Sequence, residues 1–228
     1  MTTTLNTDEI EEEIEEEDVE DLFEDQIGKI KTLLYDESNK KVLKKITPLF
    51  EELETNLMST NAYSPDQYLY FFKDEMEEYC SPDYKIDQYK VKVIELLLHY
   101  ITFDTYYIEI AADYTEKIGK LDDDYIERDE VAEEVLNTLL CYSFCLYRDN
   151  KLSKEDCNSI IYSLIRNKKF KQCASCLEIF DFDLNDEKLF HEVWNYGDVN
   201  CIKILVSKYF TLKETFKWNI SFPPTFLF

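Results

Sequence analysis

The stretch LFHEVWNYGDVNCIKILVSK, residues 189–208, predicts two short helices joined by a tight turn at Tyr196, Gly197 and Asp198. Apolar residues recur at helical spacing on both sides of this turn, at Val193, Trp194, Val199, Ile202, Leu205 and Val206. Helices this short are marginal in isolation, so the pair must pack against a neighbouring element.

The preceding stretch, IIYSLIRNKKFKQCASCLEIFDFDL at residues 160–184, has the same plan: a helix, a polar turn, a second helix and an extended exit. The first helices align at an offset of 29, as in Ile160 with Leu189, and the second helices at an offset of 28, as in Leu177 with Leu205. A period of this length predicts stacked repeats, an architecture that usually presents a binding surface.

The composition favours an all-α protein. The chain has 228 residues, enough for a substantial core, and 45% of them are hydrophobic, whereas only 3 are Gly and 5 are Pro. The acidic N-terminus does not resemble a secretory signal, and no apolar stretch is long enough to predict a transmembrane helix. The seven cysteines are scattered through predicted helices, which indicates reduced thiols and a cytoplasmic protein.

The net charge of −24 restricts the classes of ligand. Non-specific binding of DNA or RNA requires a positive surface, and an anionic membrane repels a strongly acidic chain. We therefore expect a protein partner, basic proteins included, and neither nucleic acid nor a membrane as a direct ligand.

Three regions are expected along the chain. Residues 1–25 form an acidic tail with 13 acids in the 18 residues from Asp8 to Asp25, and charge repulsion should keep this tail disordered. Residues 26–150 form a helical domain, and residues 151–228 form the repeats. The apolar end of the chain lacks the polar outer face of a terminal repeat, so we expect a truncated array in preference to an end that folds back.

Capping signals predict several helix starts. Pro48 is expected in the first turn of a helix that begins at Thr47. A capping box at residues 153–156 opens the repeat region, and a second box at residues 211–214 is expected to open a third repeat.

The two repeat units resemble divergent ankyrin repeats. The segment YGDVNCIKIL at residues 196–205 is similar to the turn and second helix of that family, and DFDLN at residues 181–185 is similar to its exit. Both units lack the Thr-Pro-Leu-His opening, and the period is 28 to 29 instead of 33. The resemblance covers residues 152–217, and residues 26–150 look like the helical domain that precedes such arrays in protist ankyrin proteins. The resemblance to ankyrin repeats implies a scaffold or adaptor without catalysis.

Two groups of residues resemble metal sites. Asp181, Asp183, Asn185 and Glu192 occupy positions 1, 3, 5 and 12 of a calcium loop, but Asp186 stands where that loop needs glycine. Cys173 and Cys176 form a single pair, whereas a structural zinc site usually needs two close pairs. We favour a polar loop for the first group and buried core cysteines for the second, and we expect no metal and no cofactor.

No set of residues predicts catalysis. The chain has only two histidines, and His99 is expected in the core of an apolar helix. The three glycines are dispersed, so the sequence contains no phosphate-binding loop.

The function that the sequence favours is a non-catalytic protein–protein interaction module, a scaffold or adaptor that binds through the repeat surface. The exposed turn residues are the candidate binding site, namely Asn167, Lys168, Lys169, Tyr196 and Asp198. The alternative is that the acidic tail binds or chaperones a basic protein.

Overall fold

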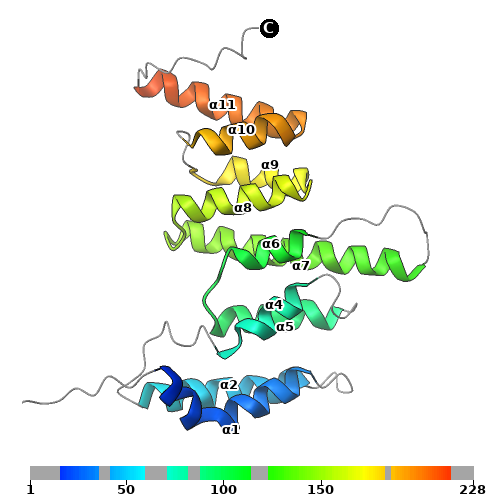
Figure 1. Ribbon diagram of the computed structural model, residues 1–228, viewed down its shortest axis with the longest axis vertical. Helices are drawn as coiled ribbons and strands as arrows, with labels where there is room; N and C mark the ends of the chain where they lie inside the picture. The colour runs from blue at the N-terminus through cyan, green and yellow to red at the C-terminus, as the bar shows by residue number, and fades with distance from the viewer. Residues whose placement is uncertain are drawn as a thin grey trace, which may run out of the picture. The chain divides into compact units, whose positions relative to one another are not determined.

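The computed structural model describes residues 16–35, 42–59, 71–81, 88–113, 123–182 and 186–216 (Figure 1). All of the regular secondary structure in these ranges is helical, in ten helices, which agrees with the predicted all-α class. Within the same ranges, no helix combines the length and the apolar character needed to cross a lipid bilayer.

The chain divides into two compact units. The first comprises Met1–Glu78 and Lys92–Thr102, and the second comprises Tyr79–Val91 and Phe103–Phe228. The division that we expected near residue 150 falls inside the second unit, and the predicted domain organisation stays a prediction.

In the first unit, helices α1 (Glu16–Leu34) and α2 (Val42–Ser59) pack against each other. Parts of α4 (Lys73–Cys80) and α5 (Gln88–Tyr100) belong to the same unit. The ring of Phe50 is central to its core, because it lies 4.9 Å from the Phe72 ring, edge-on, and stacks at 4.5 Å on the Tyr100 ring. The aliphatic side chains buried in this unit include Ile27, Ile30, Leu34, Ile46, Leu53, Leu57, Val93, Ile94 and Leu97.

Helix α1 begins earlier than the sequence suggested. Residues 16–25, which we expected to be part of a disordered tail, are helical. The positive end of the helix dipole stabilises acidic residues in the first turns of a helix, and this attraction offsets part of their mutual repulsion. Residues 1–15 of the predicted tail lie outside the described residues.

Pro48 lies inside α2 instead of in its first turn, so the predicted start at Thr47 is wrong. Proline removes one backbone hydrogen bond from a helix interior. Ile46 before the proline and Phe50 after it are nevertheless both fully buried on one face of the helix. The burial of this continuous face explains why the helix runs through the proline.

The second unit contains helices α6 (Tyr106–Ala112), α7 (Asp123–Arg148), α8 (Lys154–Arg166), α9 (Phe170–Ile179), α10 (Glu187–Tyr196) and α11 (Val199–Phe216). Helix α6 packs against α7 and α8, α8 packs against α9 and α10, and α11 packs against α9 and α10. Successive helix pairs therefore follow one another as layers (Figure 1). Both pairs predicted from the sequence are present, as α8 with α9 and α10 with α11.

Of the two predicted capping boxes, the first is confirmed at the start of α8 and the second is wrong. Ser153 caps α8, because its Oγ accepts a hydrogen bond from the Asp156 N–H at 3.0 Å and Asp156 Oδ2 accepts one from the Ser153 N–H at 2.9 Å. The second box is wrong, since α11 continues through Thr211 to Phe216 without a new start. Inside a continuous helix the preceding turn already supplies backbone acceptors, so a capping sequence there has no orphan donors to satisfy.

Helices α7 and α8 end in the same way. At the end of α8, the Lys168 N–H donates to the Ile165 carbonyl at 3.0 Å and the Lys169 N–H donates to the Leu164 carbonyl at 2.8 Å. This pair of bonds is a Schellman motif, and Lys168 accordingly has a left-handed φ of 57°. Asn150 has a φ of 56° in the equivalent motif after α7.

Gly197 ends α10 in a conformation that excludes a side chain. A Cβ at this position would lie 2.4 Å from the backbone carbonyl oxygen of Val193, which the helix holds in place. Gly28, on the exposed side of α1, has no such neighbour within 4 Å. The tight turn between α10 and α11 therefore requires glycine for steric reasons.

We expect Gly197→Ala to destabilise the second unit by about 1–3 kcal/mol, because the turn must shift to accept the methyl group. The control Gly28→Ala should stabilise the chain by about 0.5–1 kcal/mol, since alanine is the better helix former. Urea unfolding followed by tryptophan fluorescence reports on the second unit, which holds both tryptophans, and circular dichroism reports on the whole chain. Unchanged stability of Gly197→Ala would contradict the steric argument.

Lys90 is a buried cation in the second unit. Its side chain is 1% exposed, and its Nζ donates a hydrogen bond to the Ser81 carbonyl oxygen. Burial lowers the pKa of Lys90 to about 8, from a usual value of 10.5. The folded chain therefore releases this proton at a lower pH than the unfolded chain does.

The lowered pKa of Lys90 makes the folded chain more stable as the pH rises. Below pH 8 the folded state carries the full cost of the buried charge, and this cost disappears as the pH rises toward 10.5. We expect the wild-type chain to gain stability relative to Lys90→Met between pH 7 and pH 10, as measured by urea unfolding of both proteins. A difference between the two proteins that does not change with pH would contradict a lowered pKa.

Candidate functional site

The two predicted turns lie at the same end of the stacked helix pairs. Helix α8 packs against α10 and α9 packs against α11. The Cys201 thiol in the first turn of α11 lies 3.4 Å from the Phe170 carbonyl oxygen at the start of α9, to which it donates a hydrogen bond. The turns at residues 167–169 and 197–198 are therefore neighbours, at the right-hand end of these helices in Figure 1.

The three predicted residues of the α8–α9 turn differ in role. Asn167 is half-buried, and its Nδ2 donates to the Ser163 carbonyl oxygen at 3.0 Å, so this side chain closes α8. Lys168 is exposed at the left-handed position, and Lys169 is half-buried. The turn therefore presents Lys168 to solvent and uses Asn167 internally.

Tyr196 and Asp198 also differ. Tyr196 is 63% exposed. Asp198 is exposed too, but its Oδ1 accepts a hydrogen bond from the Cys201 N–H at 2.8 Å, and this bond lowers the pKa of the Asp198 carboxyl. Asp198 thus serves as the cap of α11, whereas the Tyr196 side chain is presented to solvent.

Val199 was assigned to the wrong face. The apolar pattern placed it on the packed side of its helix, but it is 69% exposed. The packed side of α11 is defined instead by Cys201 and Leu205, which are buried and four residues apart. If Cys201 is counted as apolar, this spacing identifies the buried face and places Val199 outside it.

Trp194 shows a related error. The structure buries Leu189 and Val193 of α10, again four residues apart, whereas Trp194 is 38% exposed. Its ring stacks on that of Phe190, with the ring centroids 6.4 Å apart. The two rings therefore form a contact on the side of α10 next to its buried face.

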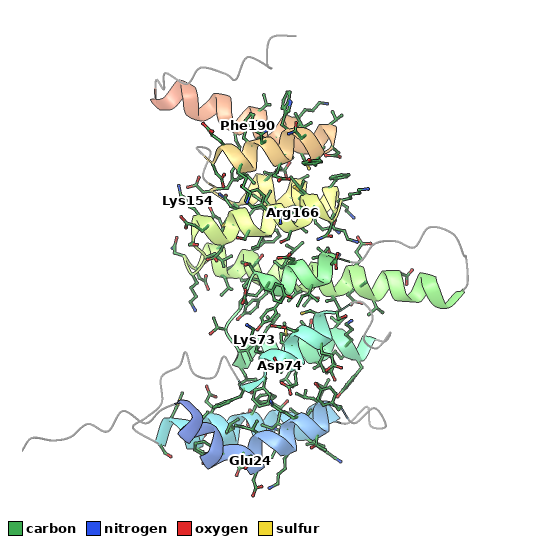
Figure 2. The ribbon with its side chains drawn as sticks, viewed as in Figure 1. Glu24, Lys73, Asp74, Lys154, Arg166 and Phe190 are labelled. Atoms are coloured by element: carbon green, nitrogen blue, oxygen red, sulfur yellow. The ribbon has the colours of Figure 1, made fainter. Side chains whose placement is uncertain are left out.

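The α8–α9 turn is the centre of a basic segment. Residues 166–171, RNKKFK, contain Arg166, Lys168, Lys169 and Lys171 and no acid. Arg166 is exposed at the end of α8, and its guanidinium lies 5.8 Å from the centroid of the Tyr162 ring (Figure 2). We call these four cations the basic turn.

The carboxylate of Asp186 connects α8 to α10. Its Oδ1 accepts hydrogen bonds from the Lys188 and Leu189 N–H groups, both at 3.0 Å, and so caps α10. Its Oδ2 accepts bonds from Asn158 Nδ2 and the Tyr162 hydroxyl of α8, both at 2.9 Å. Burial, together with this bond to Asp186, raises the pKa of Tyr162. Sequence patterns do not indicate this link, because Tyr162 and Asn158 lie 24 and 28 residues before Asp186.

The residues of the calcium pattern are only partly described, since Asp183 and Asn185 lie outside the described residues. Asp181 is exposed and forms an ion pair with Lys154 at 3.5 Å. In the part of the chain that the structure describes, no three His, Cys, Asp or Glu side chains are arranged to hold a metal ion.

The cysteine pair lies in the core with two further thiols, and all four side chains are buried: Cys157, Cys173, Cys176 and Cys201. Burial raises the pKa of Cys157 to about 11 and also raises that of Cys176. The hydrogen bond with Cys201, together with burial, raises the pKa of Cys173. The raised pKa values keep the Cys157, Cys173 and Cys176 thiols protonated at neutral pH, which makes them poor nucleophiles.

The two histidines lie on the surface. His99 in the last turn of α5 is exposed, so the prediction of a core histidine is wrong. The apolar pattern around it is carried by Leu97 and Leu98, which are buried, and His99 falls on the opposite side of the helix. His191 is also exposed, and its Nδ1 lies 3.1 Å from Asn195 Nδ2.

Comparisons of the chain with protein-family models, with curated proteins and with solved structures found no match. The resemblance to ankyrin repeats therefore stays a prediction.

The position of Asp186 predicts a large effect of its removal. Asp186→Ala should destabilise the second unit by about 2–3 kcal/mol, because a helix cap is worth about 1 kcal/mol and the Asn158 and Tyr162 donors lose their acceptor. Asp181→Ala is the matched control and should change the stability by less than about 0.5 kcal/mol, since its ion pair is exposed. Urea unfolding followed by tryptophan fluorescence measures both variants, and equal effects would contradict the assigned role of Asp186.

Proposed function

We propose that the chain is a non-catalytic protein–protein interaction module, a scaffold or adaptor. The partner binds at the end of the stack where the α8–α9 and α10–α11 turns meet. The observation that carries this proposal is the exposure of Tyr196 and Val199. Among the large hydrophobic side chains described in the second unit, these two are the most exposed, and they flank the same turn.

Exposed tyrosine and valine side chains on one rigid turn suit a protein partner. Isolated exposed apolar residues are common on any surface, but tyrosine offers a large apolar area with a polar tip and is enriched at interfaces. Gly197 and the Asp198 cap fix the backbone between the two side chains, so little conformational freedom is lost when a partner binds.

The layered packing supports the interpretation of the second unit as a repeat stack of the ankyrin-like type. The sequence offset of 28 places Cys173 on Cys201 and Leu177 on Leu205, and all four side chains are buried. Equivalent positions of successive pairs thus carry the core, while the turns differ in length and chemistry. This division between a regular core and variable turns is typical of repeat proteins that bind other proteins.

The double variant Tyr196→Ser/Val199→Ser tests the proposal. We expect the full-length variant to lose most of a partner recovered with the wild-type chain, because removal of a central tyrosine alone typically weakens an interface by about 2 kcal/mol, or roughly 30-fold. The measurement is affinity purification from lysate of the cells that produce the protein, with quantitative mass spectrometry.

The matched control is Tyr106→Ser/Ile179→Ser, which removes a tyrosine and a β-branched side chain that are also exposed on the second unit. This control should recover the same partners as the wild-type chain. Equal recovery by all three proteins would contradict the proposal. If partners are lost only when residues 1–15 are deleted, this result would favour binding through the acidic tail instead.

A further inference from the structure

The basic turn is one of two stretches of six residues in this acidic chain that hold four cations and no acid, the other being KKVLKK at residues 40–45. Exposed charges are screened beyond about 8 Å at physiological salt, so each patch acts largely on its own.

Three cations of the basic turn face solvent. Arg166, Lys168 and Lys171 are exposed and form no ion pair with any of the described residues. The acid of the neighbouring turn, Asp198, already caps α11 by accepting a hydrogen bond from the Cys201 N–H.

Lys168 does not serve the stability of its own turn, because it occupies a left-handed position that glycine or asparagine fills at lower cost. A residue that opposes local stability in this way is expected at a binding site.

We propose that the basic turn, together with Tyr196 and Val199, receives an acidic segment of a partner protein that also carries an apolar side chain. This inference rests on the proposed function and specifies the chemistry of the partner. The carboxylates of the segment pair with the cations of the basic turn, and its apolar side chain packs on Tyr196 and Val199. A long polyanion such as nucleic acid is disfavoured, because it extends beyond the patch over an acidic surface.

The test uses labelled synthetic peptides and the full-length protein. A peptide of repeated Glu-Glu-Leu should bind, as measured by fluorescence anisotropy, whereas Glu-Glu-Gly should bind more weakly and Lys-Lys-Leu should not compete. Lys168→Glu/Lys171→Glu should weaken binding of Glu-Glu-Leu by about tenfold or more. The control Lys44→Glu/Lys45→Glu changes the net charge equally at two exposed lysines of α2, outside the basic turn, and should leave the affinity within about twofold.

Three results would overturn the inference. The first is that the Glu-Glu-Leu peptide does not bind, and the second is that both lysine double variants weaken its binding equally. The third is that a single-stranded oligonucleotide competes as strongly as the unlabelled peptide does. The same variants distinguish a failure of this inference from a failure of the proposed function. If Tyr196→Ser/Val199→Ser loses its cellular partners while Lys168→Glu/Lys171→Glu keeps them, the interaction module stands and the acidic-segment inference is wrong.

Discussion

The Asp186 carboxylate is the interaction on which the geometry of the candidate site depends. Helix α10 has only 10 residues, a length that is marginal without tertiary support. One carboxylate both starts this helix and ties it to α8, through Asn158 and Tyr162. Nearby, Lys208 of α11 donates to the Phe180 carbonyl oxygen at 2.8 Å and so holds the exit of α9. The two polar links fix the register of successive pairs, and the register brings the two turns together.

The helices of the second unit could be predicted because their signals are local. The capping box at Ser153 and the spacing of Ile160, Ile161 and Leu164 define α8 without reference to the rest of the chain. The starts of α1 and α2 could not be placed in the same way. The helical residues 16–25 and the Pro48 position each oppose a local rule. The helix dipole offsets charge repulsion in the first case, and the packing of Ile46 and Phe50 outweighs the rule in the second. Periodicity thus located helices well and their ends poorly.

The candidate site was predicted only in part, because the same residue types cap helices and contact partners. Asn167 and Asp198 are polar turn residues like Lys168, but the structure uses their side chains within the helix pairs, at Ser163 and Cys201. Sequence alone does not separate these roles, since a capping bond depends on backbone geometry. Val199 was missed for a related reason: the buried face of α11 includes a cysteine, so a pattern based on aliphatic residues alone was rotated away from the true face.

The two turns differ by one residue, and this difference sets their chemistry. The α8–α9 connection uses the left-handed Lys168 to close a Schellman motif, and the Lys168 side chain is exposed on a wide turn. The shorter α10–α11 connection brings Gly197 against the Val193 carbonyl, which leaves room only for the side chains on either side of it. The wide turn presents cations, and the narrow turn beside it is flanked by Tyr196 and Val199. Charge and apolar area therefore lie together at one end of the stack. Since the helix pairs beneath have equivalent cores, the difference between the turns alone can give this end its specificity.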